Sequence, residues 1–375
     1  LHRLIRRQRQ MCIRDRYTIF GGMKSVLYTS VLQTPILLLG SLIILVLGFK
    51  ELGGWDEMMR VCGAVTVNDY GDTMTNLIRS NDDANFPWLG ALIGSAIIGF
   101  WYWCTDQFIV QRVLSGKNEK EARRGTIFGA YLKLLPVFLF LIPGMIAFAL
   151  HQKYIGAGGE GFLPMLANGT ANADAAFPTL VAKLLPAGVK GLVVCGILAA
   201  LMSSLASLFN SSAMLFTIDF YKRFRPETPE KKLVGIGQIA TVVIVILGIL
   251  WIPIMRSVGD VLYTYLQDVQ SVLAPGIAAA FLLGICWKRT SAQGGMWGLI
   301  AGMIIGLTRL GAKVYYSNAG EVADSTFKYL FYDMNWLFFC GWMFLFCIIV
   351  VIVVSLATEA PTCLLYTSPS PRDRG

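Results

Sequence analysis

The chain has 375 residues, of which 55% are hydrophobic and only 15% are charged, and its mean hydropathy is +0.60. Ordinary soluble domains carry about 25% charged residues, so this composition excludes a soluble globular protein and indicates a polytopic membrane protein. The formal charge of +9 comes largely from the two ends and does not indicate a nucleic-acid partner.

Both ends of the chain are expected to be non-native. The peptides MCIRDR (11–16) and CLLYTS (363–368) can be encoded by one DNA word read on opposite strands, and this word resembles a transposon end used in sequencing adapters. We therefore expect adapter-derived tails at 1–16 and 363–375, around a truncated membrane domain at 17–362. The tails hold eight of the 32 Lys and Arg and two of the 23 Asp and Glu, which leaves a formal charge of +3.

The residues that remain do not favour an enzyme or a metalloprotein. Six cysteines are left, and only Cys62 falls in a predicted aqueous loop, so the pattern predicts neither a disulfide framework nor a zinc site. His151 is the only remaining histidine. We find no pairing of a nucleophile with a base, and we expect no resident cofactor.

Membrane spans are predicted from apolar stretches of about 20 residues, which cross a hydrocarbon core of ~30 Å. The short loops at 112–124, 221–232 and 287–292 carry twelve Lys and Arg, so these loops are expected on the cytoplasmic side. Eight stretches qualify as spans: 27–49, 87–111, 125–150, 188–220, 233–255, 261–286, 293–311 and 333–357.

The second stretch leads into WYWCTDQ, and Asp106 lies inside its end. An ionisable group at that depth is a candidate functional residue. One interpretation is a discontinuous helix that faces a substrate, where Tyr102 and Trp103 offer flat apolar faces with a polar edge. The alternative is an aromatic belt at the membrane interface.

Lys133 is a second charge inside a predicted span. It lies nine residues after Arg124, a rise of ~13 Å into the membrane. Pro136 and Pro143 allow the helix to bend around a polar cavity that Lys133 would face. The alternative is a lysine whose long stem reaches back to the interface.

A stripe of small residues follows in AALMSSLASLFNSS (199–212). Ala200, Ser203, Ser204, Ser207 and Ser211 repeat at i, i+3, i+4 spacing and so share one face of a helix. Serine hydroxyls and a helix carbonyl are oxygen ligands of the kind that hard cations prefer. The spacing is equally compatible with close helix packing through small residues, which spacing alone favours over a sodium site.

The segment YLQDVQSVLAPG (265–276) places Gln267, Asp268 and Gln270 in the outer part of a span, before a predicted Pro-Gly break. Polar residues beside such a break line a cavity in many membrane proteins. They also fit a helix end at the interface, and the sequence favours neither reading.

These segments together resemble the sodium/solute symporter family, and within it the sodium/glucose cotransporter branch. The resemblance runs through WYWCTDQFIVQR, AYLKLLP with IPGM, AALMSSLASLFNSSAMLFTIDFYKR and YLQDVQSVLAPGIAAAFLLGICWKR, and covers residues 17–362. It implies an all-α transporter core of five plus five inverted-repeat helices. The chain would contain the last helix of the first repeat, the whole second repeat and two further helices, without the first four core helices.

The resemblance also implies roles for individual residues. Tyr102 matches an inner-gate tyrosine and Trp103 its neighbour in the sugar cavity, and Gly99 stands where relatives have a polar cavity residue. Lys133 and Gln267 match sugar-binding positions. Ala200, Ser203 and Ser204 match the sodium site, which raises the sodium reading above helix packing.

The implied activity is sodium-coupled symport of a sugar, glucose- or galactose-like, by a multi-pass protein of the plasma membrane, with Na⁺ as coupling ion. Within the family the alternative is a symporter for an organic acid or amino acid, whose carboxylate Lys133 would pair. A membrane sensor with a transporter-like fold is the alternative from another class. A signalling module after residue 362 would favour that sensor.

Overall fold

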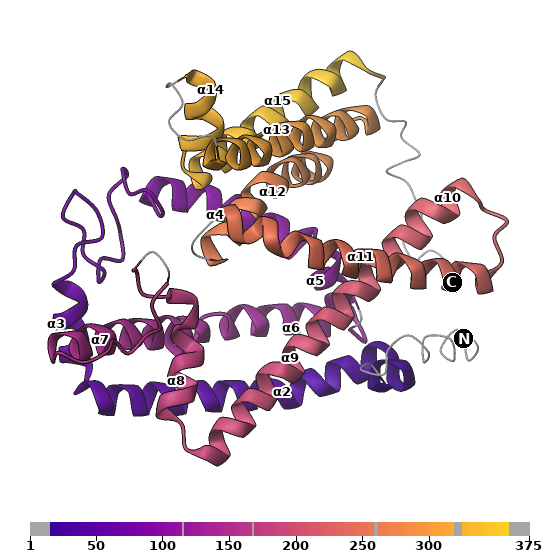
Figure 1. Ribbon diagram of the computed structural model, residues 1–375. Helices are drawn as coiled ribbons and strands as arrows, with labels where there is room; N and C mark the ends of the chain where they lie inside the picture. Colours follow the sequence, from indigo (N-terminus) through magenta and orange to yellow (C-terminus); the bar gives the residue numbers. More distant parts are fainter. Residues whose placement is uncertain (1–15, 115, 167–168, 259–261, 319–324, 360–375) are drawn as a thin grey trace. The chain divides into compact units, whose positions relative to one another are not determined.

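The computed structural model describes residues 16–114, 116–166, 169–258, 262–318 and 325–359 (Figure 1). The described chain is built from helices, with isolated bridges at Thr66–Thr73 and Met165–Ala171 in place of strands. It forms two compact units. Unit 1 contains residues up to 67 together with 73–75 and 112–252, and unit 2 contains 68–72, 76–111 and the residues from 253 onward.

Unit 1 is organised around three long helices, α2, α7 and α9. Helix α2 packs against both of the others. A Cβ added at Gly40 would overlap Val193 of α9, and one at Gly48 would lie 3.0 Å from Ile146 of α7. Glycine at these two positions therefore lets the helices approach closely. The helices of unit 1 are α2 (Arg16–Leu52), α3 (Trp55–Gly63), α6 (Glu119–Leu132), the π-helix η1 (Val137–Leu141), α7 (Ile142–Gly156), η2 (Ala173–Ala175), α8 (Ala176–Leu184), α9 (Ala187–Met214), the π-helix η3 (Leu215–Tyr221), α10 (Lys222–Phe224) and α11 (Glu230–Val258), whose last residues belong to unit 2.

The core of unit 1 is apolar and lies between α2, α7, α8 and the loop after α7. Its fully buried members include Ile44, Leu150 and Leu180. His151 is buried beside them, and its Nδ1 accepts a hydrogen bond of 3.0 Å from the backbone N–H of Leu163. The lone histidine outside the tails thus holds a loop against α7.

Unit 2 is a bundle in which α12, α13 and α15 pack against one another, while α4 packs on α12 and α15. Its core joins Ile97 and Ile98 of α4 to Ala274 and Ala278 of α12 and to Leu337 of α15. The helices are α4 (Trp88–Cys104), α5 (Gln107–Leu114), which continues into unit 1, α12 (Leu262–Cys286), α13 (Ala292–Asn318), α14 (Thr326–Lys328), the π-helix η4 (Tyr329–Asp333) and α15 (Trp336–Ala357).

Six helices among the described residues are long and apolar enough to span a membrane, or seven if the bent pair α4–α5 is one span. The prediction of an all-α polytopic protein is confirmed, and six or seven of the eight expected spans are found among the described residues. Helix α9 runs from Ala187 to Met214, but only its part Ala187–Met202 counts as an apolar helix, which is shorter than a span.

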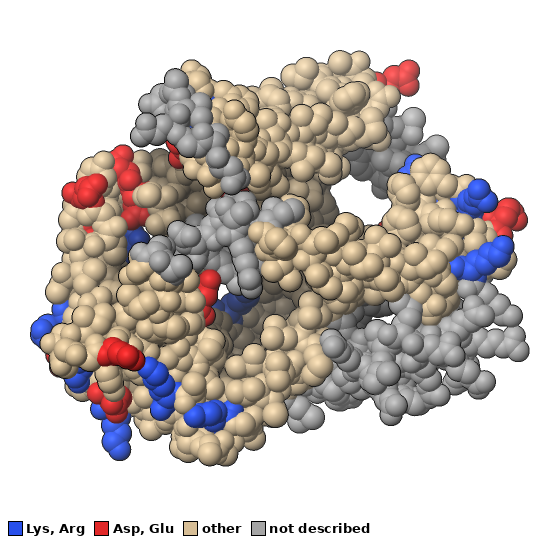
Figure 2. Space-filling view, in the orientation of Figure 1, with Lys and Arg blue, Asp and Glu red and all other residues tan. Residues whose placement is uncertain are grey.

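The surface fits a membrane environment. Most of the face seen in the space-filling view carries no charged side chain (Figure 2). Large apolar side chains such as Val242, Leu247 and Leu250 of α11 are more than half exposed. Such exposure is unfavourable in water and agrees with the multi-pass membrane character of the chain.

Candidate functional site

The break predicted at WYWCTDQ is present, and Asp106 has a structural role in it. Helix α4 ends at Cys104 and α5 begins at Gln107, with a bend of 50° between them. The Oδ1 atom of Asp106 accepts a hydrogen bond of 2.9 Å from the N–H of Phe108, and Thr105 Oγ1 donates to the Trp101 carbonyl at 2.7 Å. Asp106 therefore caps α5, while Thr105 satisfies a carbonyl at the end of α4.

Three predicted substrate residues lie on the last turns of α4. Tyr102 and Trp103 form an edge-to-face ring pair with centroids 5.5 Å apart, and Trp103 is 41% exposed. Gly99 lies one turn earlier, and a Cβ built there would meet no heavy atom within 4 Å. The structure thus brings Gly99, Tyr102 and Trp103 together just before the helix break.

Gln267 lies near the start of α12. It belongs to the same unit as the aromatic pair Tyr102 and Trp103 but lies at a different height along the helix axis. The ring of Phe100 on α4 contacts Phe281 of α12, with centroids 6.0 Å apart. Gln267 precedes Phe281 by about 21 Å along α12, so the structure does not bring it beside the aromatic pair. Its Nε2 donates to the Tyr263 hydroxyl at 3.3 Å.

The Pro-Gly break predicted after Gln270 is absent, which corrects that expectation. Helix α12 continues through Pro275 and Gly276 to Cys286. A Cβ at Gly302 of α13 would lie 3.1 Å from the Gly276 Cα, so Gly276 serves close packing of two helices. Proline inside a membrane helix is tolerated when neighbouring groups and packing support the backbone.

Lys133 lies in unit 1 at an interruption of its span. It is the C-cap of α6, where its N–H donates to the Gly129 carbonyl, and it is followed by a turn and by the π-helix η1. Pro136 immediately precedes η1. Residues Glu119–Gly156 still form one candidate span, and the bend expected at this proline stays a prediction. The Lys133 side chain is exposed, and its role in substrate binding stays a prediction.

The predicted sodium residues lie on one continuous helix. Ala200, Ser203 and Ser204 all belong to α9, so the helical spacing assumed for the stripe is confirmed. Ala200 is half-buried and Ser204 is exposed, while the side chain of Ser203 is outside what the structure describes. No group of three or more His, Cys, Asp or Glu suited to a metal ion occurs among the described residues. The sodium site at the hydroxyl stripe therefore stays a prediction.

Sequence reasoning missed a buried ionic cluster in unit 2. The carboxylate of Asp268 on α12 accepts a hydrogen bond of 2.5 Å from Lys313 Nζ and one of 3.4 Å from Arg309 Nη2, both on α13. Arg309 also donates to the Met334 carbonyl at 2.8 Å and lies 4.0 Å above the ring of Phe339. The sequence did contain a signal that indicates such a cluster. Arg309 and Lys313 are two cations four residues apart in an apolar helix, and such charges in a span need a partner.

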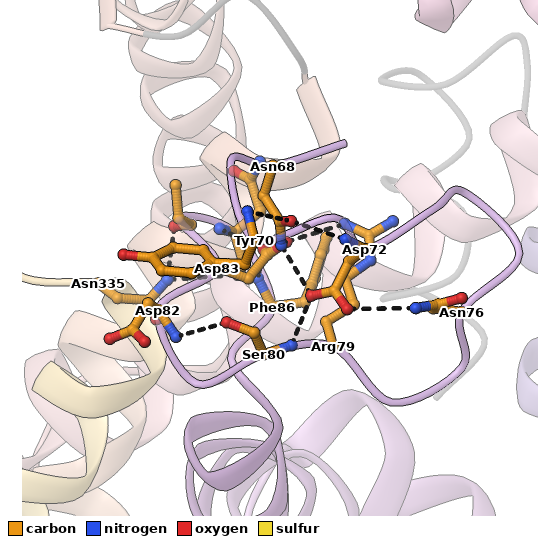
Figure 3. A network of polar contacts seen from close by, with 12 residues as sticks. Asn68, Tyr70, Asp72, Asn76, Arg79, Ser80, Asp82, Asp83, Phe86 and Asn335 are labelled. Atoms are coloured by element: carbon orange, nitrogen blue, oxygen red, sulfur yellow. Dashed lines mark hydrogen bonds and ion pairs between the residues drawn. The ribbon is translucent and has the colours of Figure 1, made fainter. Parts of the chain in front are cut away.

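A second polar network organises the loop that precedes α4 (Figure 3). Asp83 is buried and accepts hydrogen bonds from the N–H groups of Asn85 at 2.9 Å and Phe86 at 2.7 Å. The Asn68 amide bridges Asp83 and Asp72, and Asp72 in turn accepts from the Ser80 N–H. The network joins α15 through its N-terminus, where Asn335 donates to the Ala84 carbonyl and the Trp336 indole donates to the Asn85 carbonyl.

The hydrogen bonds in this loop shift the pKa of its two bonded carboxylates. Burial alone raises the pKa of Asp83, but bonds from the Phe86 and Asn85 N–H groups and the charge of Arg79 outweigh it and hold the pKa below 3.8. The bond from the Ser80 N–H, with that from Asn68, lowers the pKa of Asp72. Both carboxylates are therefore ionised at neutral pH.

Comparison with known proteins identifies the class. The sequence profile of the sodium:solute symporter family matches residues 11–302, and the chain belongs to this family. Its members are transporters and not enzymes, and Na⁺ is their coupling ion and not a bound cofactor. The expected resemblance is therefore confirmed, and the character of the family agrees with the expectations of no enzymatic activity and of Na⁺ as coupling ion.

Individual relatives carry the comparison further. The chain is 37% identical to sodium/glucose cotransporter 1 of Ovis aries over 93% of its own length and 55% of the relative. It is 36% identical to sodium/myo-inositol cotransporter 2 of Homo sapiens, over 92% and 53%. It is 37% identical to the sodium/mannose cotransporter of Bos taurus, over 94% and 61%. The chain thus spans somewhat more than half the length of the curated relatives it matches.

Proposed function

We propose that this chain is part of a sodium-coupled symporter that carries a sugar or polyol across a membrane. The observation that carries the proposal is the similarity of almost the whole chain to relatives named for glucose, myo-inositol and mannose cotransport. These relatives share sodium as the coupled ion and a polyhydroxylated solute. Within that class we propose a glucose- or galactose-like substrate and the plasma membrane as the location.

The proposed substrate contacts come from three segments. Tyr102 and Trp103 provide aromatic faces against which a sugar ring stacks, and Tyr102 also closes the inner side of the cavity. Lys133 and Gln267 donate hydrogen bonds to sugar hydroxyls, Gln267 in a conformation that brings the start of α12 nearer to the aromatic pair than it lies in this structure. Support comes from the open space beside Gly99, from the helix break after Trp103 and from the turn at Lys133, because interrupted membrane helices occur where they line cavities.

Sodium is proposed to bind at Ala200, Ser203 and Ser204 on α9, where a backbone carbonyl and two hydroxyls supply oxygen ligands. Sodium that binds the outward-open state more tightly than the inward-open state shifts the protein toward the former, by no more than its difference in affinity. Sugar binding then permits closure. Transport needs no covalent step in this scheme.

The test is uptake of labelled solutes into proteoliposomes that contain the full-length reading frame around this chain, with and without an inward sodium gradient. We expect sodium-dependent uptake of a hexose or polyol. Ser204→Ala, which removes one hydroxyl, is expected to raise the sodium concentration for half-maximal uptake, and Ser212→Ala, a serine later in α9, serves as its control. Sodium-independent uptake, or uptake of organic acids or amino acids alone, would contradict the proposal.

The chain itself is expected to be inactive. It spans 53% to 61% of these relatives, and the first-repeat helices expected to complete both sites are not among its predicted segments. Residues 17–362 alone, reconstituted in the same vesicles, are therefore expected to take up no sugar. Sodium-dependent uptake by this segment would show that both sites are complete within it.

A further inference from the structure

The ionic cluster of unit 2 connects three helical elements at one point. Asp268 belongs to α12, Arg309 and Lys313 to α13, and the Met334 carbonyl that accepts from Arg309 lies directly before α15. The side chains of Arg309 and Asp268 are 0% and 7% exposed. A carboxylate buried in a membrane span is stable only with such partners, so the position of α12 at this level depends on α13.

The same two helices are held by a different contact farther along. A Cβ at Gly306 would lie 2.5 Å from Val272 Cγ1, and Gly276 and Gly302 place the two backbones in direct contact. Pro275 lies next to this contact and removes one backbone hydrogen bond of α12. The part of α12 before Pro275 is therefore held by the ionic cluster and, one turn later, by the contact of Val272 with Gly306, and the part that begins at Gly276 is held by its contact with Gly302.

Gln267 immediately precedes Asp268 in this first part of α12. Successive side chains on an α-helix point about 100° apart, so fixing the direction of Asp268 also fixes the direction of Gln267. The hydroxyl of Ser271, one turn later, donates to the Asp268 carbonyl at 2.6 Å and is fully buried. The ion pairs of Asp268 hold this side of α12 against α13, and Gln267 lies beside it.

We propose that Asp268, Arg309 and Lys313 form a positioning cluster that sets the direction of Gln267, and that Lys313 is its adjustable member. The proposal rests on the proposed function, in which Gln267 contacts the substrate. The Lys313 side chain is 21% exposed whereas that of Arg309 is fully buried. Removing Lys313 leaves Asp268 paired with Arg309, so the fold persists while one of the two contacts that orient Asp268 is lost.

The first experiment measures coupling between Lys313 and Gln267 in the full-length protein. Lys313→Met is expected to raise the sugar concentration for half-maximal uptake about tenfold, the effect of losing one charged hydrogen bond, with little change in maximal rate. If the cluster acts through Gln267, the double variant Lys313→Met/Gln267→Ala transports like Gln267→Ala alone, within about twofold. Multiplying effects of the two substitutions would overturn the proposal.

Matched variants separate positioning from folding. Lys313→Arg keeps a cation at the site and is expected to restore half-maximal uptake to within about twofold of the parent. Lys232→Met removes an exposed lysine of α11 and is expected to have no effect. If Lys313→Met does not fold, Lys313→Gln, which keeps a donor, takes its place in the double-variant comparison.

The second experiment does not depend on transport. Gln267→Cys is introduced, and modification of the new thiol by a small thiol reagent is followed with and without Lys313→Met. The parent protein, which keeps Gln267, supplies the background from the other cysteines. A change in the modification rate is expected, and an unchanged rate would contradict the positioning role. If the parent protein takes up no sugar, the proposed function fails, and the modification rate still decides whether the cluster orients position 267.

Discussion

Among its described residues, unit 2 contains two buried carboxylates, Asp83 and Asp268, and it stabilises them by different means. Asp83 lies in the loop before α4 and is bonded mainly by neutral donors, two backbone N–H groups and the Asn68 amide, with Arg79 at 3.5 Å. Asp268 lies within a span and is bonded by two cations. Near water, oriented amides suffice to hold an ionised carboxylate, whereas in an apolar bundle its charge must be balanced.

The largest effect is expected for Asp268→Ala. The substitution leaves Arg309 and Lys313 without their counter-charge, and breaking a buried ion pair from one side costs about 3–5 kcal/mol. The free energy of unfolding of the chain in mixed detergent micelles, followed by tryptophan fluorescence, is the measurement. Asp333→Ala, which removes an exposed carboxylate of η4, is the control and is expected to stay within about 0.5 kcal/mol of the parent.

One result would contradict the importance of charge balance at Asp268. If Asp268→Ala costs no more than the loop substitution Asp83→Ala, then the membrane-span cluster is not held by charge balance. The packing of α12 on α13 through Gly276 and Gly302 would then carry the stability of this part of the bundle.

Asp83→Ala is expected to have the second-largest effect. The N–H groups of Asn85 and Phe86 lose their acceptor, and an unsatisfied buried donor costs about 1–3 kcal/mol. Hydrogen exchange of the Phe86 amide reports this loss locally, and faster exchange is expected there than in α13. Asp82→Ala at the exposed neighbouring position serves as control, and equal exchange in both variants would contradict the role assigned to Asp83.

The fold also shows which structural features can be predicted from local sequence patterns and which cannot. The membrane class, the helices, the break at Asp106 and the interruption near Lys133 follow from local patterns, namely apolar length, cap residues and prolines. The ionic cluster does not, because its members meet only when α12 and α13 pack side by side. The same holds for Pro275, which has the signature of a break but is accommodated by the contact of Gly276 with Gly302.

Among the predicted site residues, only those on one element could be grouped from sequence. Tyr102 and Trp103 share the end of α4, and Ala200, Ser203 and Ser204 share α9. Whether Gln267 belongs with the aromatic pair depends on the register between α4 and α12, which no local pattern fixes. In the structure, Phe100 pairs with Phe281 and so sets Gln267 at another level.

A smaller effect is expected from Arg79→Met. Its guanidinium is 3.5 Å from the Asp83 carboxylate and its side chain is 22% exposed, so the pair contributes no more than about 1 kcal/mol. Exchange of the Phe86 amide is again the measurement, at low and at high salt. A loss as large as that of Asp83→Ala would mean that the loop depends on charge balance in the same way as α12, and the contrast between the two carboxylates would disappear.

The smallest effect concerns pH. The pKa of Asp83 and that of Asp72 are both held below the ordinary value of 3.8, so each carboxylate contributes stability that is fully present above that value and is lost as pH falls through its lower value in the folded loop. The protection factor of the Phe86 amide is therefore expected to stay constant between pH 7 and about pH 5 and to fall only in stronger acid. Asp83→Asn keeps one acceptor oxygen and does not titrate in this range, so it should retain a weaker acid dependence that comes from Asp72. A decline in protection between pH 7 and pH 5 in the parent would mean that burial, which raises the pKa of Asp83, outweighs the backbone hydrogen bonds. The loop carboxylate would then also require a cation to stay ionised.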